Sequence, residues 1–287
     1  MTAAAIQIGL AAWAFAAWRG PYFPLDRPPL ESYAKVFATV EGNITFYTLP
    51  DAQTVARWCE ILRGRKFSFC FKLPRQVTHG GLARERALLS TLFRRLEPLA
   101  EHVGPFMIQL PPRIGRAELG DVGALLQALP REHAYALEFR NPALMRAPEP
   151  MFDLLQRYEC GRVLLDSRPI YGDAPAHADL AAAEREKPDL PVLWQGPETL
   201  RIVRFVGHPL LAHSRPFVAQ WAEHLQGWLQ PGRQLHFMVH CPNDIHSPGL
   251  ARAIHMEFRA GLHTSNGAAA IVAPMPAWRV AQLGLDF

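Results

Sequence analysis

Eight short runs rich in β-branched and aromatic residues recur along this chain, and a helical pattern or a connecting segment separates each run from the next. This alternation is typical of repeated βα units, which build a parallel sheet. Eight such units close into a barrel, so we expect an α/β fold of the TIM-like (β/α)₈ class. The expected strands are residues 6–9, 39–47, 67–74, 105–112, 135–140, 161–167, 200–207 and 234–241.

Helical patterns fill most of the intervals between these runs. The expected helices are residues 29–37, 52–62, 82–101, 117–129, 150–158, 216–229 and 249–262. Closed α/β barrels reach this length as one domain, so residues 1–262 are expected to form a single barrel. Residues 263–287 then form a tail that is packed against the outside or partly mobile.

The sixth connection, residues 168–199, is the irregular one. It is rich in Pro, Ala, Gly and Asp and holds only a short helical pattern around residues 178–186. Long connections of this kind are typical of functional lids or of disordered inserts. The sequence does not decide between these two roles.

The composition, with 49% hydrophobic and 20% charged residues, is that of an ordinary globular protein. A formal net charge of +4 suits an anionic ligand, but the basic residues are scattered. Nucleic acid is therefore permitted as a partner without being indicated. The four cysteines form no Cys-x-x-Cys pair, which predicts reduced thiols in a cytoplasmic protein. No stretch has the about 20 consecutive apolar residues of a membrane helix, and no pattern fixes the oligomeric state.

Polar residues of the expected strands keep to one of the two faces that strand side chains alternate between. Lys72 lies opposite Phe71 in this alternation, and Glu138 lies opposite Leu137. Because a charge among apolar helix faces costs much free energy, we expect the polar face to point into the barrel. The charges stand late in their strands, where barrels of this class hold their active sites. A ring of charged side chains is therefore expected at the carboxyl ends of the strands.

The ring predicts an enzyme that uses acid–base chemistry on a small phosphate- or carboxylate-bearing substrate. The expected catalytic residues are Glu41, Glu138, Asp166 and His240. The expected substrate-binding residues are Asn43, Lys72, Gln109, Arg140, Arg204 and Trp13. Phosphoester hydrolysis and sugar-type isomerisation both fit this set. The competing interpretation is a set of ion pairs that only closes the barrel mouth.

Two other functions fit the same region. One is a metal-dependent hydrolase or nuclease, because carboxylates and imidazoles at strand ends build metal centres. Its ligands would come from His79, Glu138, Asp166, His208, His240 and His246. These histidines lack the compact spacing of metal ligands, so no metal or other cofactor is predicted, and a divalent metal stays the alternative. The other function is a non-catalytic barrel that binds a metabolite or the phosphates of a nucleic acid.

Four ordered motifs resemble those of the YecE-like family, also called domain of unknown function 72. They are Val40-Glu41-Gly42-Asn43-Ile44-Thr45-Phe46-Tyr47, the stretch from Phe71 to His79, Gln109-Leu110-Pro111-Pro112 and Glu138-Phe139-Arg140. The resemblance covers about residues 6–262. It implies a barrel related to the TIM fold and no defined activity.

The chain departs from the family pattern at three places. The family's Gly-Thr-Ser-Gly-Trp opening reads Gly9-Leu10-Ala11-Ala12-Trp13 here and has lost both hydroxyls. Gly42 stands where the family has isoleucine, and Cys241-Pro242-Asn243-Asp244 replaces an Asn-Asn pair. The chain is therefore identified as a divergent member. If the lost groups bind ligand in relatives, this chain binds a different ligand or has lost activity.

Overall fold

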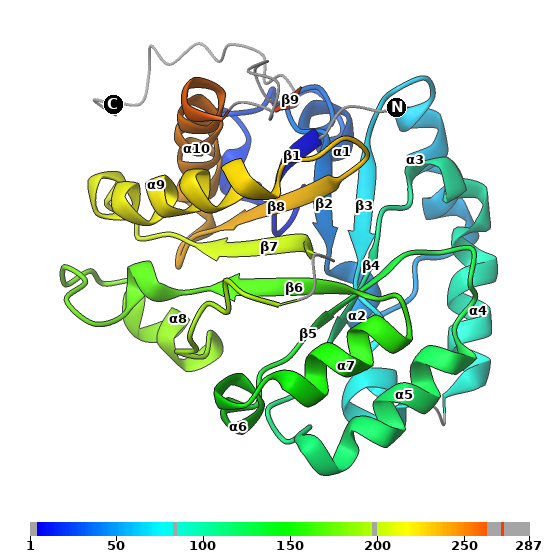
Figure 1. Ribbon diagram of the computed structural model, residues 1–287. Coiled ribbons are helices and arrows are strands. Elements are labelled where there is room, and N and C mark those ends of the chain that lie inside the picture. Colours follow the sequence, from blue (N-terminus) through cyan, green and yellow to red (C-terminus); the bar gives the residue numbers. More distant parts are fainter. Residues whose placement is uncertain (1–4, 83–84, 197–199, 263–270, 273–287) are drawn as a thin grey trace. The chain divides into compact units, whose positions relative to one another are not determined.

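The computed structural model describes residues 5–82, 85–196, 200–262 and 271–272. In these residues, eight parallel strands alternate with helices, as a TIM-like (β/α)₈ barrel requires (Figure 1). The strands are β1 (Ala5–Leu10), β2 (Thr39–Gly42), β3 (Ser68–Phe71), β4 (Phe106–Gln109), β5 (Tyr135–Glu138), β6 (Gly161–Asp166), β7 (Leu200–Val206) and β8 (Gln234–His240). The eight expected strands are thus confirmed, most of them shorter than expected.

A ninth strand, β9 (Ile271–Val272), pairs in parallel with the start of β1. It lies within the expected tail, and the sequence pattern did not indicate it. The other residues of that tail lie outside the described residues.

Helices follow the strands near the expected positions. They are α1 (Pro29–Tyr33), α2 (Ile44–Tyr47), α3 (Ala52–Leu62), α4 (Arg86–Leu96), α5 (Leu119–Ala128), α6 (Pro142–Arg146), α7 (Glu149–Arg157), α8 (Leu180–Glu186), α9 (Leu211–Trp228) and α10 (Ser247–Gly261). Of these, α2 and α6 were not expected, and both have five residues or fewer. Helices this short leave no periodic signal in a sequence.

The strands fall into two compact units of the chain. The first unit holds residues up to Val40, Asp166–Asp189 and the residues from Arg204 on, and the second holds Glu41–Leu165 and Leu190–Val203. The boundary falls inside β2, after Val40, and inside β7, after Val203, so each unit holds a part of both strands. In the first unit the strand order is β2, β1, β8, β7, and in the second β7 is followed by β6, β5 and β4. In the second unit, isolated bridges at Phe69–Val103 and Lys72–Met107 join β3 to the region of β4.

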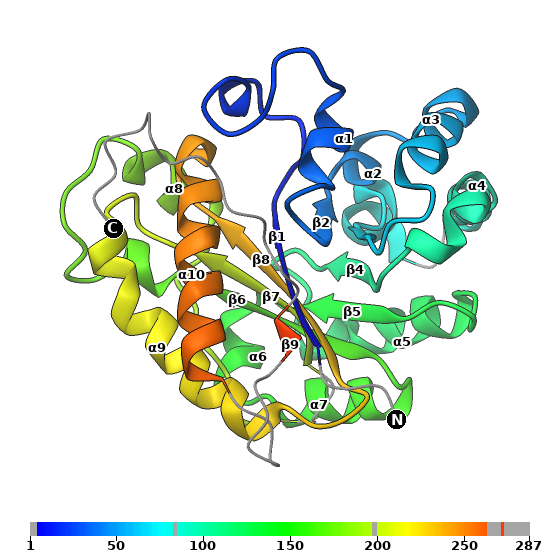
Figure 2. The ribbon, with the colours of Figure 1, turned by 90° about the horizontal axis from the view of Figure 1, so that it is seen from above.

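In the first unit, β1 and β8 pair over the whole length of β1, from Ala5 with Gln234 to Leu10 with Val239. Helices α9 and α10 lie side by side along these strands (Figure 2). The ring of Phe237 on β8 contacts the rings of Trp221 on α9 and Phe258 on α10, at centroid distances of 5.6 and 5.2 Å. These aromatic contacts fix both helices against the sheet.

In the second unit, the strand alternation expected for β3 is confirmed by its aromatic face. Phe69 and Phe71 are fully buried and pack against Trp58 of α3, at centroid distances of 5.4 and 6.1 Å. Since neighbouring strand residues point to opposite faces, Lys72 points away from this helix. Because Phe69 and Phe71 pack against α3, the Lys72 side chain lies on the opposite face, where it contacts Glu41 and Gln109.

The expected second strand, residues 39–47, is wrong in its second half. The strand ends at Gly42, Asn43 has helical backbone angles (φ −67°, ψ −19°), and Ile44–Tyr47 form α2. The helical turn lets the Thr45 hydroxyl donate to the carbonyl oxygens of Lys72, at 2.6 Å, and of Gly42, at 3.1 Å. Strand alternation therefore places Glu41 as expected but does not extend to Asn43.

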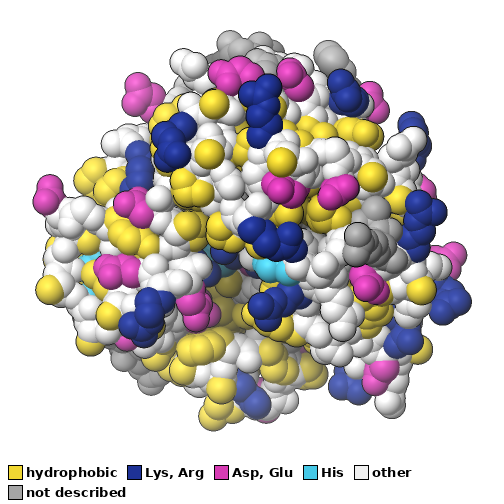
Figure 3. Space-filling model, turned by 90° about the horizontal axis from the view of Figure 1, so that it is seen from below, with side chains coloured by type: hydrophobic (Ala, Val, Ile, Leu, Met, Phe, Trp, Pro, Cys, Tyr) yellow, Lys and Arg dark blue, Asp and Glu magenta, His cyan; other side chains and the backbone are white. Residues whose placement is uncertain are grey.

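The surface carries both signs of charge. On the face shown in Figure 3, Lys and Arg side chains lie singly or in small groups among Asp and Glu side chains. This intermixing agrees with the scattered basic residues of the sequence. In the described part of the chain, no helix is long and apolar enough to cross a membrane.

Candidate functional site

Four neighbouring strands of the second unit end in polar side chains. Glu41 lies near the end of β2, Lys72 follows β3, Gln109 ends β4 and Glu138 ends β5. Gln109 and Glu138 are register partners across β4 and β5. Parallel strands bring their carboxyl ends to one edge, so these side chains share one region of the unit.

Lys72 joins the ends of three strands. Its ammonium Nζ lies 2.9 Å from Glu41 Oε1 and donates to Gln109 Oε1 at 3.0 Å. The side chain of Glu41 is fully buried, and that of Lys72 is 7% exposed. The ammonium also lies 5.6 Å from the ring centroid of Phe46 on α2. A buried carboxylate needs a partner of this kind to stay charged.

Arg140 and Glu138 form a second ion pair. The Arg140 Nε donates to Glu138 Oε1, and the two side chains are 12% and 1% exposed. Within the part of the chain that the structure describes, the two terminal nitrogens of Arg140 make no hydrogen bond. The guanidinium is thus fixed by one nitrogen and presents two others. Such a fork matches the two oxygens of a carboxylate or phosphate.

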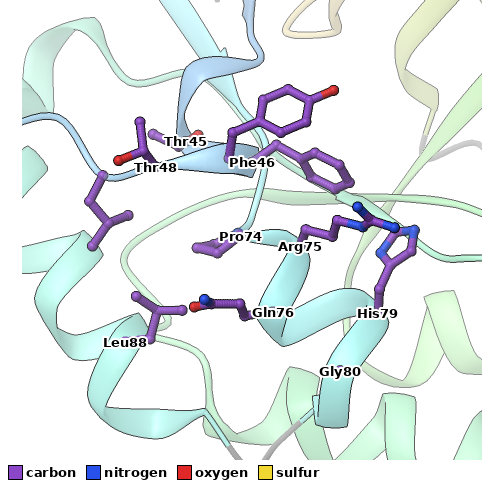
Figure 4. A pocket seen from close by; sticks show the side chains of 11 residues that line it. Thr45, Phe46, Thr48, Pro74, Arg75, Gln76, His79, Gly80 and Leu88 are labelled. Carbon is purple, nitrogen blue, oxygen red and sulfur yellow. The ribbon is translucent and has the colours of Figure 1, made fainter.

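A pocket of about 660 Å³ opens beside α2 and the residues that follow β3. Arg75 and His79 point toward one another on one side of it, below the ring of Phe46 (Figure 4). The Phe46 and His79 rings meet edge to face at a centroid distance of 5.4 Å. The opposite side of the pocket includes Gln76 and Leu88.

His79 is the histidine that lines this pocket. Partial burial lowers its pKa, and the charges of Arg75, Arg140, Arg113 and Lys72 lower it further. Its Nδ1 lies 2.8 Å from the Thr78 hydroxyl, which fixes the ring. At neutral pH the imidazole is therefore neutral, and it can take up or give away a proton.

The charges around His79 do not cancel. Four cations act on it, whereas two buried carboxylates, Glu41 and Glu138, are paired with two of those cations. The two carboxylates balance the charges of Lys72 and Arg140, so the positive charges of Arg75 and Arg113 make the region positive overall. The region therefore favours an anionic ligand.

In the first unit, Asp166 is held by four hydrogen bonds. Arg168 donates from Nε, at 2.9 Å, from its backbone N–H, at 3.1 Å, and from a terminal nitrogen, at 2.8 Å. The indole Nε1 of Trp221 donates to the same carboxylate at 2.8 Å. These donors occupy both oxygens of a fully buried carboxylate. This geometry fits an anchor for the start of the sixth connection.

The remaining expected residues of the first unit are Arg204, His240 and Trp13. Arg204 on β7 and His240 at the end of β8 are 2% and 4% exposed. Trp13, which follows β1, is half-buried. The structure brings Glu41, Lys72 and Gln109 together and pairs Glu138 with Arg140, all in the second unit. A complete ring with Asp166, Arg204 and His240 stays a prediction.

The expected metal ligands do not gather into a centre. Among the described residues, no group of three His, Cys, Asp or Glu side chains could hold a metal ion. His79, with its four neighbouring cations, lies in a region that repels a metal cation. All four cysteines are free, as expected, and Cys70, Cys160 and Cys241 are buried.

Two arginines of this region, Arg75 and Arg113, were not among the expected site residues. Both follow a polar strand end after leucine and proline, in Lys72-Leu73-Pro74-Arg75 and in Gln109-Leu110-Pro111-Pro112-Arg113. Arg113 donates to the backbone oxygen of His79. The repeated order of a polar residue, Leu, Pro and Arg was the signal that could have revealed them.

A second group of titratable side chains, the histidine group, lies in the first unit. It consists of His177, His208, His213 and His246, with Asp179 beside it. His208 Nδ1 accepts from the Leu210 N–H at 2.9 Å, and its Nε2 lies 2.9 Å from the Pro175 oxygen. Only neutral imidazole, with the proton on Nε2, satisfies both bonds. His208 thus ties the sixth connection to the end of β7.

Stability is expected to fall when the pH falls below about 6.5, the ordinary pKa of histidine. Burial lowers the pKa of His208 and of His246, and the charge of His177 lowers both further. The unfolded chain then binds protons that the folded chain does not bind, so acid favours unfolding. Urea unfolding at pH 7.5 and 5.5 measures the difference. The loss of unfolding free energy between pH 7.5 and 5.5 should be smaller in His208→Asn than in the unaltered protein, and unchanged in His102→Gln. The same loss in both variants would contradict this.

Comparisons with known proteins agree with the fold. The profile of the family described as "Protein of unknown function DUF72" matches residues 7–272. The YecE protein of Escherichia coli K12 is 33% identical over 261 residues, which are 90% of this chain and 94% of that protein. The same figures hold for YecE of Escherichia coli O157:H7.

Solved structures show the same architecture. A DUF72 protein of Enterococcus faecalis V583 has a TM-score of 0.66 at 15% identity, with 88% of this chain and 94% of that chain covered. A DUF72 protein of Thermotoga maritima MSB8 has a TM-score of 0.63 at 19% identity, with 88% and 98% covered. A D-psicose 3-epimerase of Clostridium cellulolyticum H10, solved with D-tagatose, has a TM-score of 0.50 at 12% identity, with 89% and 99% covered. At these identities the likeness concerns the fold.

Proposed function

The chain belongs to the DUF72 family, which is described as being of unknown function, and we propose that it is an enzyme that acts on a small phosphate- or carboxylate-bearing substrate by acid–base chemistry. The observation that carries the proposal is the Arg140 fork. Glu138 holds the guanidinium by Nε, and two terminal nitrogens remain for a ligand within the described structure. This arrangement sits at the strand edge where barrels of this class act.

Each residue of the second unit has a role in the proposal. Arg140 binds the anionic group, and the excess charge of Arg75 and Arg113 attracts it. Glu138, the carboxylate paired with Arg140, accepts a proton from the substrate. His79, neutral and fixed by Thr78, passes the proton on. Lys72, Glu41 and Gln109 keep the strand ends in place.

Of phosphoester hydrolysis and sugar-type isomerisation, isomerisation requires fewer catalytic groups. A base and a proton carrier on one anionic substrate suffice for it, whereas hydrolysis also needs a positioned water. The intermixed surface charges support a small ligand rather than a nucleic acid, because phosphate backbones bind to extended basic surfaces (Figure 3).

Anion binding tests the proposal. Inorganic phosphate, titrated by calorimetry, is expected to bind to the protein and to bind about 12- to 140-fold more weakly to Arg140→Met, which corresponds to a charge-assisted hydrogen bond of about 1.5–3 kcal/mol. Arg63→Met is the matched control, since it removes an exposed arginine of the same unit. Equal losses in both variants, or no phosphate binding by the unaltered protein, would argue against the site.

A further inference from the structure

We propose that the pocket beside α2 binds a planar ring of the substrate, so that the ligand is an aromatic or heteroaromatic compound with a phosphate or carboxylate group. The inference rests on the proposed function, which assigns the anionic group to Arg140. The ring would lie against Tyr47. Nothing in the charge network of the strand ends requires a ring, so the two ideas can fail separately.

Tyr47 is the first observation. It is 79% exposed, although it lines the pocket. Its ring meets that of Phe46 edge to face, at a centroid distance of 5.2 Å and an interplanar angle of 89°. Most of the Tyr47 surface is thus open to a ligand, while Phe46 supports the ring from one side. A supported tyrosine offers a large contact area and loses little conformational freedom when a ligand binds.

Phe46 connects this ring to the charged groups. It contacts His79 at a centroid distance of 5.4 Å, and the Lys72 ammonium lies 5.6 Å from its centroid. Arg75, which lines the pocket, and Arg140 both lower the pKa of His79. The pocket therefore holds an open aromatic ring together with the cation of Arg75. A ligand with a ring at one end and an anion at the other matches both groups.

The pocket walls fit a ring better than a small anion alone. Leu49, Pro74 and Leu88 provide apolar surface, and Gln76 provides an amide that can donate to and accept from ring heteroatoms (Figure 4). The volume of about 660 Å³ is that of a pocket for an organic ligand. A phosphate ion by itself would leave this apolar wall in water.

Two sugar phosphates, one with an aromatic base and one with a hydroxyl in its place, test the inference. AMP and ribose 5-phosphate share the sugar phosphate, and AMP adds adenine. By calorimetry, AMP should bind at least tenfold more tightly. Tyr47→Ala should weaken AMP binding by about 5- to 140-fold, as loss of one stacking contact does, and should leave ribose 5-phosphate binding unchanged. Tyr47→Phe should retain the AMP affinity, because the ring remains.

The controls separate the inference from the proposed function. Arg140→Met should weaken both ligands equally, since both use the anion site. Met256→Ala, which removes another exposed apolar side chain, should change neither. If both ligands bind equally and Tyr47→Ala has no effect, the ring site is wrong while the anion site stands. If neither ligand binds, both proposals are wrong. Because Tyr47 is exposed, its variants are expected to fold.

Discussion

Replacing Lys72 by methionine is expected to lower the free energy of unfolding by about 3–5 kcal/mol. The substitution removes the ammonium that lies 2.9 Å from Glu41, whose side chain is fully buried. It also removes the bond to Gln109 and the contact with the Phe46 ring. A carboxylate left alone in the interior must bind a proton or draw in water, and either change costs stability. Urea unfolding measures the loss.

The matched control is the surface pair of Lys35 with Glu31. Its N–O distance is 2.7 Å, shorter than that of the buried pair, but Lys35 is 40% exposed. Lys35→Met should therefore cost at most about 1 kcal/mol. The double variant Lys72→Met with Glu41→Gln should recover part of the loss, because no charge is left buried. A Lys72→Met variant as stable as Lys35→Met would show that Glu41 is not buried as a charge.

Gly42→Ala is expected to lower the free energy of unfolding by about 1–3 kcal/mol, the usual cost of an overpacked core. A Cβ at this position would lie 2.4 Å from Phe71 Cδ1 and 3.0 Å from Phe71 Cα. The phenyl ring can turn away, but the backbone of β3 cannot. The isoleucine that the family pattern has here should cost more still. Chemical unfolding of Gly42→Ala and Gly42→Ile measures which variant loses more free energy of unfolding.

Two further variants make this test specific. Gly120→Ala on α5, where a Cβ would have nothing within 4 Å, should be neutral or stabilising because alanine favours helix. Phe71→Leu, combined with Gly42→Ala, should be less destabilising than the sum of the two changes, since the smaller side chain relieves the clash. If Gly42→Ala unfolds at the same urea concentration as the unaltered protein, the close approach of β2 to β3 is not as described.

The sequence predicted what depends on alternation along strands. Phe69 and Phe71 on one face of β3 required Lys72 on the other, and the strand order then brought it to Glu41 and Gln109. The family resemblance and the strand count led to the same barrel independently. Both signals are properties of many residues, so a local irregularity did not disturb them.

What the sequence could not predict depends on single contacts between distant residues. Asp166 accepts a hydrogen bond from Trp221, which stands 55 positions later on α9, and no pattern along the chain indicates this contact. Helix α2 has four residues, too few for a periodic pattern, and it arises where Gly42 approaches Phe71. The pocket beside it, with Tyr47 exposed, follows from that turn and from no motif.

The carboxylate of Asp166 also connects two elements of the first unit. It accepts hydrogen bonds from Arg168, at the start of the sixth connection, and from Trp221, in the middle of α9. A displacement of one element therefore strains the bonds to the other. The connection cannot swing out at this end without taking the Arg168 guanidinium away from a fully buried carboxylate. Any opening of residues 168–189 must therefore start at the far side, where His208 Nε2 donates to the Pro175 oxygen at 2.9 Å. The two ends of this segment are thus held by different residues, and protonation of His208 breaks its bond with the Leu210 N–H while the bond to Pro175 stays.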